Sequence, residues 1–516
     1  MINLLQNKKL VLLWKKKILI FLIVLICFAV FLRFHNLSNI YIFNFDEEYQ
    51  ASYAMTLVKD FHPIWIGVSA GFLDFYMGPY FTYFTAFWLW FSQGDPLLTA
   101  YVAGVVGVST SVVVFFTGWK FFNLTTGIIG SLLYAGLPLV VFYDQKFWNP
   151  MFVQLIVLLM FVSLMLTKKS VWWWLLYAAL IGVIFETDLL PIPLALIGIW
   201  FFIKGKYFLN KKLVLSCVLV FLLFYWPLLV FDYFHNFSNL TVLGRYSEQA
   251  EKVGAKIDPQ KKILSVFDTM GRFWYLEPGN SNADEISTAC YSVSTKPELS
   301  FIDKYSQRTS PRLGLIALSV GLFLSFLFIS FKKKQEAYLL LSCFILISLG
   351  SYIFYSGGTF EYYLHGFVTL FVFIPGIIIS QIHKKYKPFF YALIGFVLIL
   401  GTYTVLHTSD SFSLGAKKRL IAKVMNVVSN EKFSIEGIGV CHNWEGWRYL
   451  FKVYGKTPSR SYTDQNFGWL YLGEIYEGEV SYEVILAESR ISSNIDISGY
   501  DRINEGGYSA FIKKIK

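Results

Sequence analysis

The sequence is poor in charge. Only 15% of its 516 residues are Asp, Glu, Lys or Arg, whereas 55% are hydrophobic. A typical soluble domain carries about 25% charged residues, so this composition indicates an integral membrane protein. The formal net charge is +11, but the lysines gather in short clusters between apolar runs. Membrane proteins keep such clusters on the cytoplasmic side, and this distribution argues against nucleic-acid binding.

Cysteine is scarce as well. The five cysteines show no CxxC or other metal-ligand spacing, which argues against zinc and dithiol redox motifs. Cys27, Cys217 and Cys343 lie in apolar runs, where we expect inert packing. Cys290 and Cys441 fall in segments that we predict outside the cytoplasm, where a disulfide between them can form. The first apolar run lacks a small-residue cleavage site, so we interpret it as a retained helix.

Apolar runs, by contrast, are abundant. A spanning helix needs about 20 mostly apolar residues. About eleven runs qualify, near 18–34, 97–117, 124–143, 150–167, 171–188, 189–203, 213–231, 312–331, 336–356, 364–382 and 388–407. The basic clusters between them are separated by even numbers of crossings. The positive-inside rule then puts the N-terminus in the cytoplasm of a multi-pass plasma-membrane protein.

One aromatic stretch, 79–91 (PYFTYFTAFWLWF), would disturb this parity if it crossed the membrane. Its tyrosines and tryptophans favour the headgroup region, so we predict an interfacial helix on the outer face. The outer face then also receives the loops 35–96 and 232–311 and the chain after 407.

Residues 408–516 differ in character from the membrane domain, 1–407. They contain a predicted amphipathic basic helix near 417–430 and a second predicted helix at 444–454. Strand-like runs occur at 433–440, 482–487 and 509–512. The predicted fold is therefore an α-helical polytopic membrane domain followed by a small extracytoplasmic α/β domain.

Polar residues collect at the predicted outer ends of the spans. They are Asp46, Glu47 and Glu48 after the first span, Asp144 and Lys146 in YDQKFWNP, Glu186 and Asp188 in FETDLLP, and Tyr362, Tyr363 and His365 in FEYYLHG. Ionisable residues at the membrane edge are costly and mark functional sites. Their convergence at one face predicts a shared cavity.

An acid-lined cavity on the outer face suits sugar transfer from a polyprenyl phosphate, because nucleotide-activated donors lie in the cytoplasm. A carboxylate base would take the acceptor proton, and a cation or metal would hold the departing phosphate. Asp46 suits the first role. Lys146, together with Arg245, suits the second. The stretch 79–91 could line a groove for the lipid.

Four motifs carry a resemblance to a known family: FDEEYQASYA, MGPYFTYFTAF, YDQKFWNPM and EYYLHGFVTLFVFIPG. Together they resemble the bacterial members of glycosyltransferase family 39. These include protein O-mannosyltransferases, lipid A aminoarabinose transferases and galacturonosyl transferases of the Rgt type. The resemblance covers roughly residues 15 to 385. It implies the GT-C membrane fold, with a catalytic acid in the first extracytoplasmic loop.

Residue by residue, the resemblance makes Asp46 the catalytic acid and Glu47 its acidic neighbour. Lys146 stands where many relatives have Arg, and Tyr362 and Tyr363 resemble the family's aromatic pair. Structural interpretations exist beside these. Glu47 could serve the helix dipole, and Lys146 could be an interfacial lysine reaching water.

The chain departs from the family in FETDLLP, where many relatives carry Gln and His. Glu186 and Asp188 could instead bind a divalent cation such as Mg or Mn, or could be solvated loop residues. Asp144 and His365 complete the predicted substrate-binding set, with ordinary interfacial polarity as the alternative.

Two other functions compete with the glycosyltransferase. A transporter or flippase of lipid-linked glycans would place its ionisable residues near the midplane, often in repeated halves. The acids here lie at one face and no half-repeat is visible, which favours the enzyme. A receptor or scaffold with a degenerate membrane half is the third hypothesis, and the intact Asp46-Glu47 pair argues against it.

Overall fold

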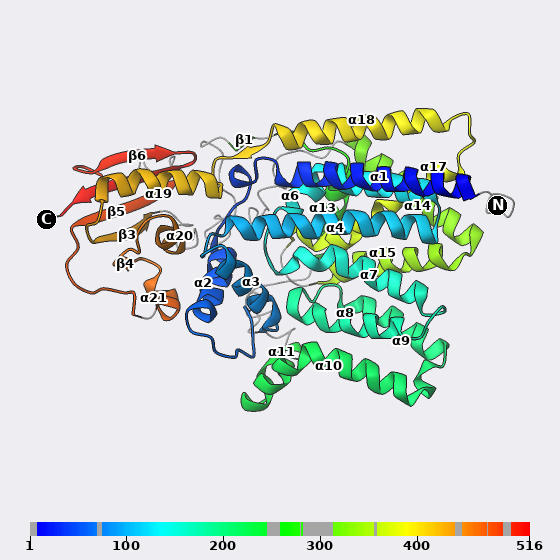
Figure 1. Ribbon diagram of the computed structural model, residues 1–516, viewed down its shortest axis with the longest axis horizontal. Coiled ribbons are helices and arrows are strands. Elements are labelled where there is room, and N and C mark those ends of the chain that lie inside the picture. The colour runs from blue at the N-terminus through cyan, green and yellow to red at the C-terminus, as the bar shows by residue number, and fades with distance from the viewer. Residues whose placement is uncertain are drawn as a thin grey trace.

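The computed structural model describes residues 8–69, 75–244, 258–278, 280–281, 313–355, 359–438, 446–471, 473–488 and 497–515. Figure 1 shows a bundle of helices running side by side, with a mixed α/β unit at one end. The predicted disulfide between Cys290 and Cys441 and the predicted ligand Arg245 lie outside the described residues.

The bundle is built from apolar helices. They are α1 (Lys8–Phe34), α4 (Leu97–Phe121), α5 (Leu124–Gly136), α6 (Pro138–Asp144), α7 (Val153–Leu166), α8 (Trp173–Thr187), α9 (Ala195–Lys204), α10 (Lys211–Phe234), α14 (Leu313–Lys333), α15 (Glu336–Phe354), α16 (His365–Phe371), α17 (Phe373–Gln381) and α18 (Lys387–Leu406).

Within the described residues, eight helices are long and apolar enough to cross a membrane. The pair α5 and α6, bent by 63°, would make a ninth span, and α8 and Ile192–Lys204 are shorter apolar helices. Each predicted span therefore has a helical counterpart. Proline at the start of α6 supplies no N–H to continue the helix, which accounts for the break after Gly136.

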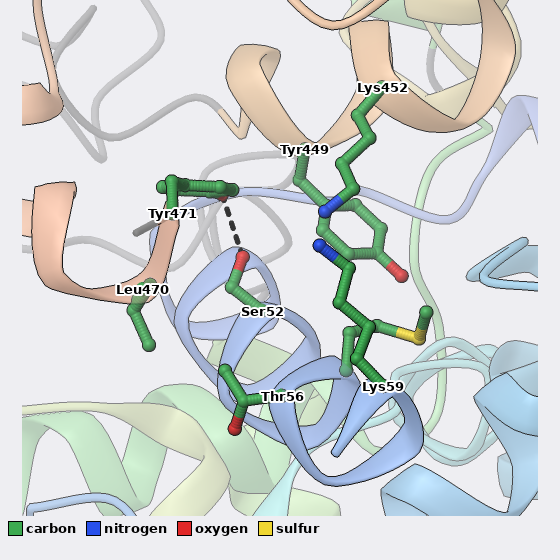
Figure 2. Close-up of a pocket in the computed structure, with 8 residues that line it drawn as sticks. Ser52, Thr56, Lys59, Tyr449, Lys452, Leu470 and Tyr471 are labelled. Carbon is green, nitrogen blue, oxygen red and sulfur yellow. Dashed lines mark hydrogen bonds between the residues drawn. The ribbon is translucent and has the colours of Figure 1, made fainter. Parts of the chain in front are cut away.

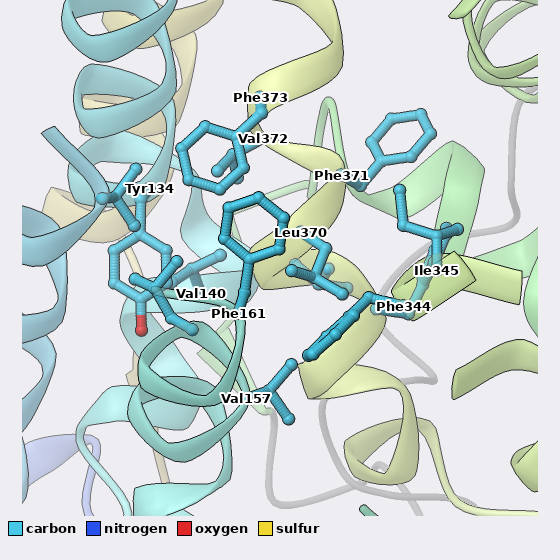
Figure 3. Close-up of a cluster of buried hydrophobic side chains, with 14 of the residues drawn as sticks. Tyr134, Val140, Val157, Phe161, Phe344, Ile345, Leu370, Phe371, Val372 and Phe373 are labelled. Atoms are coloured by element: carbon cyan, nitrogen blue, oxygen red, sulfur yellow. The ribbon is translucent and has the colours of Figure 1, made fainter. Parts of the chain in front are cut away.

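The bundle has a packed centre and an apolar periphery. Figure 3 shows Val157 and Phe161 of α7 beside Phe344 of α15 and Leu370 of α16, all of them fully buried. Helices α14 and α18 instead expose large apolar side chains, such as Phe328. A helix that is apolar on all sides and exposed on one suits contact with lipid.

Two helices lie where the bundle meets the α/β unit: α2 (Phe45–Lys59) and α3 (Tyr80–Phe91) (Figure 1). Helix α3 has 12 residues. It is therefore only about 18 Å long and too short to cross a hydrocarbon core of about 30 Å. The helix expected at 79–91 is confirmed, and its position at the membrane interface stays a prediction.

The C-terminal unit is a five-stranded sheet with the strand order β4-β3-β5-β7-β6. Its elements are α19 (Leu414–Val428), β3 (Phe433–Ile438), α20 (Trp447–Tyr454), β4 (Arg460–Ser461), α21 (Asp464–Phe467), η11 (Gly468–Tyr471), β5 (Tyr482–Glu488), β6 (Asp501–Glu505) and β7 (Tyr508–Lys514). β3 pairs in parallel with β4 and β5, whereas β7 runs antiparallel to β5 and β6.

All five elements predicted in this unit are present, and the sequence analysis missed the short strand β4 and the edge strand β6. The domain boundary at 407/408 stays a prediction. The unit joins the bundle through a backbone bond from Leu414 N–H to the Tyr41 carbonyl, 2.7 Å long. A second link is the short ladder of β1 (Asn280–Ser281) with β2 (Ser409–Asp410).

Candidate functional site

Helix α2 carries three acidic residues in its first turn. Glu47 accepts a hydrogen bond from the backbone N–H of Asn44 at 3.1 Å, and the two residues form a capping box. Negative charge is favourable here because the first N–H groups of a helix are partly positive. Successive helical residues point about 100° apart. The acids Asp46, Glu47 and Glu48 therefore face three different surroundings.

Asp46 is the exposed member of the three. Solvent reaches it, yet protein atoms surround it closely enough that desolvation raises the pKa of its carboxyl. The Glu47 charge raises this pKa further, and the Lys146 charge opposes both effects. An accessible carboxylate with raised proton affinity is suited to accept a proton. The assignment of Asp46 as the base stays a prediction, and this environment is compatible with it.

Lys146 lies beside the acids, in the loop between α6 and η4 (Asn149–Phe152). Its Nζ is 3.5 Å from Glu47 Oε1 and 4.1 Å from the centre of the Trp148 ring. The side chain keeps 28% exposure, so its ammonium remains accessible to a ligand. The indole face and the carboxylate hold the cation without enclosing it. The pairing of Lys146 with Glu47 brings two predicted site residues together.

Two tyrosines extend this cluster from η9 (Glu361–Leu364). The Tyr362 ring lies 4.5 Å from that of Trp148 and 4.2 Å from that of Tyr363. Tyr362 is within electrostatic range of Asp46 and of Asp188. Asp188 accepts a hydrogen bond from Leu190 N–H at 2.9 Å, and burial raises the pKa of its carboxyl to about 6. Glu47, Lys146 and Tyr362 are thus within electrostatic range of Asp46, and Tyr363 and Asp188 lie near Tyr362.

The sequence analysis missed two cations, which helix α13 (Pro259–Arg272) brings to this region. Lys262 Nζ lies 4.5 Å from the Tyr352 ring centre and 5.8 Å from that of Tyr363. Burial lowers the pKa of Lys262 to about 8. The Arg272 guanidinium lies 2.9 Å from Glu361 Oε1. The signal was available, because α13 is an amphipathic stretch within the long loop 232–311, in which only Arg245 was singled out.

Asp144 has a different environment from the one expected. Its Oδ2 accepts hydrogen bonds from Arg33 Nη2 at 2.6 Å and from Arg33 Nε at 2.9 Å. Tyr134 donates to its Oδ1 at 3.3 Å, and Arg33 also donates to the carbonyls of Tyr134 and Ala135. All these groups are buried. They connect α1, α5 and α6, so this geometry favours a structural role, and substrate binding by Asp144 stays a prediction.

Glu186 anchors helix α3. Its Oε2 accepts a hydrogen bond from Tyr80 N–H at 2.8 Å, at the first turn of the helix. Gly78 permits this contact, because a Cβ atom at that position would collide with the Glu186 carboxylate. A carboxylate at a helix N-terminus is a stabilising arrangement. Glu186 therefore contacts the start of α3, whereas Asp188 bonds within its own turn, although only one residue separates them.

The predicted divalent cation finds no ligand set in the described part of the chain. No group of three or more His, Cys, Asp or Glu side chains there could hold a metal ion. Glu186 faces the start of α3, whereas Asp188 is directed to its own turn and to Tyr362. The pair does not have the convergent oxygens that a divalent ion requires. Metal binding by Glu186 and Asp188 therefore stays a prediction, and we derive no chemistry through a metal.

His365 begins α16, behind the tyrosines. It is buried, with its ring 3.9 Å from that of Tyr143. Tyr143 donates a hydrogen bond to Glu361, which also receives one from Thr269 of α13. His365 is thus adjacent to the network that holds α13 and within electrostatic range of Lys146. This places it at the inner edge of the cluster, and its role in substrate binding stays a prediction.

The C-terminal unit supports the same helix, α2. Glu48 is buried and accepts hydrogen bonds from Tyr449 N–H and from the Tyr471 hydroxyl, both at 3.2 Å. Burial raises the pKa of Glu48. Lys417 of α19 donates to the Phe43 carbonyl at 2.8 Å and to Asn44 Oδ1 at 3.3 Å. The residues that start α2 are therefore held by the α/β unit.

A small pocket separates the two parts along the Glu48 side of α2. Figure 2 shows Ser52 hydrogen-bonded to Tyr471 on one side of it, with Lys59 and Lys452 on the other. The two lysines both pair with Glu474. The pocket is thus crossed by polar contacts between α2 and the C-terminal unit, and it lies on a different face of the helix from Asp46.

No model of a known protein family matches the sequence, and no curated protein matches it. Solved structures do resemble it. ArnT from Cupriavidus metallidurans bound to undecaprenyl phosphate aligns with a TM-score of 0.57 at 10% identity, over 96% of this chain and 98% of that one. The apo form of the same protein aligns with a TM-score of 0.53 over the same shares. The fold implied by the family resemblance is thereby confirmed: this chain has the fold of the GT-C membrane glycosyltransferases.

Proposed function

We propose that this protein is a plasma-membrane glycosyltransferase that moves a sugar from a polyprenyl-phosphate donor to an acceptor on the outer face. The observation that carries the proposal is the solvent-accessible Asp46 carboxylate within electrostatic range of the Lys146 ammonium, at one end of a GT-C fold. A base and a phosphate-binding cation are the two groups that this reaction requires.

The likeness to ArnT supports the donor class, because that protein binds undecaprenyl phosphate. In this chain Lys146 would contact the donor phosphate. Lys262 extends the positive charge behind Tyr363, whereas the charge of Arg272 is balanced by Glu361. The burial of Lys262 strengthens its electrostatic attraction of a phosphate, since little water screens it. Tyr362 and Trp148 would form the wall between the phosphate and the base.

The proposed reaction is one direct displacement. An acceptor hydroxyl oxygen attacks the anomeric carbon, and the bond from that carbon to the phosphate oxygen breaks. The electron pair leaves with the polyprenyl phosphate, whose charge Lys146 stabilises. Asp46 accepts the hydroxyl proton. Attack opposite the leaving group inverts the anomeric configuration.

The test uses membranes that contain the full-length protein and a polyprenyl-phosphate-linked radiolabelled sugar. Asp46→Asn should lower transfer by about two to four orders of magnitude, which is typical of losing a general base. Asp60→Asn is the matched control, because Asp60 is an exposed carboxylate at the other end of the same helix. Transfer by Asp46→Asn at the wild-type rate would refute the assignment of the base.

A further inference from the structure

Two tyrosines continue the face of α2 that carries Asp46. Tyr49 and Tyr53 follow Asp46 at spacings of three and seven residues, which places all three on one side of the helix. The two tyrosine rings are nearly parallel, at 9°, with centres 6.4 Å apart. The proposed base therefore lies at the end of an aromatic strip.

Trp469 of η11 turns this strip into a corner. Its ring centre lies 6.2 Å from that of Tyr49 and 6.1 Å from that of Tyr53, at interplanar angles of 73° and 64°. We call these three side chains the aromatic corner. Trp469 is 51% exposed. Contiguous exposed apolar patches mark binding sites, and this indole forms such a patch together with the two half-buried tyrosines.

Neither domain contact nor membrane anchoring accounts for this exposure. The adjacent residues Leu470 and Tyr471 are buried and already make the contact with α2. Figure 1 shows α21, the helix that directly precedes η11 in the chain, beyond α2 on the side away from the bundle. An aromatic belt that anchors a protein lies instead where spanning helices end.

The chemistry of in-line displacement indicates what the corner faces. The acceptor oxygen and the leaving phosphate must lie on opposite sides of the anomeric carbon. Glu47, which contacts Lys146, lies about 100° around α2 from Asp46 in one direction, and Tyr49 lies about 60° in the other. With the phosphate near Lys146, the acceptor approaches Asp46 from the aromatic corner.

We infer that the aromatic corner binds a sugar ring of the acceptor, so that the acceptor is a glycan. The inference rests on the proposed function for the direction of approach. One face of a pyranose is made of C–H groups, which pack on aromatic rings while the hydroxyls stay in water. The aromatic corner has two walls, one made by the partly buried tyrosines and the other by the exposed indole. This shape fits one sugar ring and leaves the next sugars of the glycan in solvent.

Binding is measured first, without donor. Full-length protein in detergent is mixed with mannotriose, chitotriose or galactotriose, and saturation-transfer NMR records which ring protons contact the protein. Wild type should saturate the C–H face of at least one trisaccharide. Trp469→Ala should abolish the signal and Trp469→Phe should retain it. Trp172→Ala, which removes a more exposed indole elsewhere, should change nothing.

Absence of saturation for all three trisaccharides would overturn the inference, and so would an undiminished signal in Trp469→Ala. A serine- and threonine-rich peptide is the competing probe. Binding of this peptide that depends on Trp469, with no sugar binding, would identify a protein acceptor and refute a glycan.

Kinetics then separate this inference from the proposed function. Trp469→Ala should raise KM for the glycan acceptor roughly tenfold, as expected for losing one aromatic contact, and leave KM for the donor unchanged. Sugar binding without any transfer by wild type would refute the proposed function and leave the corner intact. Sugar transfer by Trp469→Ala with an unchanged KM for the acceptor would refute acceptor binding by the aromatic corner and leave the proposed function standing.

Discussion

Two ion pairs flank Gln145, and they differ in almost every respect. Asp144 and Arg33 approach to 2.6 Å, with their side chains 2% and 0% exposed. Lys146 and Glu47 are 3.5 Å apart, and the lysine keeps 28% exposure. Gln145 itself donates to the carbonyl of Arg33 at 2.9 Å. Asp144 and Lys146, the charged residues on either side of Gln145, therefore lie in opposite environments.

This difference separates a charge that stabilises the fold from one that is accessible to a ligand. We call Asp144 with Arg33 the sealed pair and Lys146 with Glu47 the open pair. The Arg33 guanidinium donates to one carboxylate and three carbonyls, so its hydrogen bonds are used within the fold. Burying such a pair is tolerable only when its polar atoms are satisfied. Lys146 instead lies 3.5 Å from a carboxylate and over an aromatic face, and it stays partly exposed. Its charge can be shared with a ligand at little cost to the fold.

The largest expected effect follows from breaking the sealed pair. Arg33→Met leaves the Asp144 carboxylate buried without its cation, which should destabilise the protein by about 3–5 kcal/mol. The measurement is the thermal unfolding midpoint of the purified protein in detergent. The double variant with Asp144→Leu should recover part of the loss, because no charge then remains buried. Equal stability of Arg33→Met and wild type would remove the basis of the comparison.

Breaking the open pair should affect activity instead. Lys146→Met should lower sugar transfer by about 10²–10³-fold, the usual effect of losing a group that stabilises developing charge. Its unfolding midpoint should fall by less than that of Arg33→Met, because Lys146 is partly exposed and the Glu47 carboxylate, although only 4% exposed, keeps its hydrogen bond from Asn44 N–H. Lys146→Arg is the control and should keep most of the transfer. A large loss of stability in Lys146→Met would make this pair structural too.

Substitution of Lys417 tests whether a fully buried cation can also affect sugar transfer. It is fully buried and donates to Phe43 and Asn44 at the start of α2. Lys417→Met should cost about 1.5–3 kcal/mol, the range for hydrogen bonds to charged groups, and should reduce transfer because Asn44 begins the helix. The adjacent, exposed Lys418→Met should do neither. Unfolding midpoints and initial rates measure both effects.

The pH dependence of transfer distinguishes the partners of Asp46. The base acts when deprotonated, so transfer should fall as the pH drops through its raised pKa. Glu47→Gln removes a negative neighbour, lowers that pKa and should move the acidic limb to lower pH. Lys146→Met removes a positive neighbour and should move the limb the opposite way. Gln retains an oxygen that accepts the Asn44 bond. Identical pH profiles for wild type and both variants would show that Asp46 does not determine the loss of transfer at low pH.

The smallest effect is expected at a third ion pair, Lys168 with Glu336. These side chains are 66% and 36% exposed, although their distance is only 2.6 Å. Lys168→Met should change the free energy of unfolding by less than about 1 kcal/mol, because water and salt screen exposed charges. Unfolding midpoints at low and high salt measure this. A loss comparable to that of Arg33→Met would show that distance, rather than burial, governs the comparison.

Much of the fold was predictable because hydrophobicity and length are local properties. The run 97–117 is apolar enough to predict α4, and the alternating run 433–440 predicts β3. Strand β4 has only two residues and exists because β3 provides its partner. Such a strand has no pattern of its own. The bend between α5 and α6 was likewise hidden inside one continuous apolar run, 124–143.

The site was predictable in part. Asp46, Glu47 and Lys146 stand out in sequence because charge is rare at the edge of an apolar run. Asp144 stands out for the same reason, and nothing in the sequence indicates that Arg33 lies 2.6 Å away. Neither Lys262 nor Arg272 was singled out from the sequence. Their burial against Tyr352 and Glu361 depends on how a long loop folds back.

The sequence by itself determined that the chain crosses a membrane many times, where its helices run, and which end of the bundle collects acids. These features follow from the composition, the hydrophobic periodicity and the even number of membrane crossings between basic clusters. Only the tertiary structure decided which charges are sealed and which are open, and that the C-terminal unit holds the start of α2. Pairing depends on side chains 111 residues apart, as for Arg33 and Asp144, or about 370 apart, as for Lys417 and Asn44. No local pattern encodes a contact of that range.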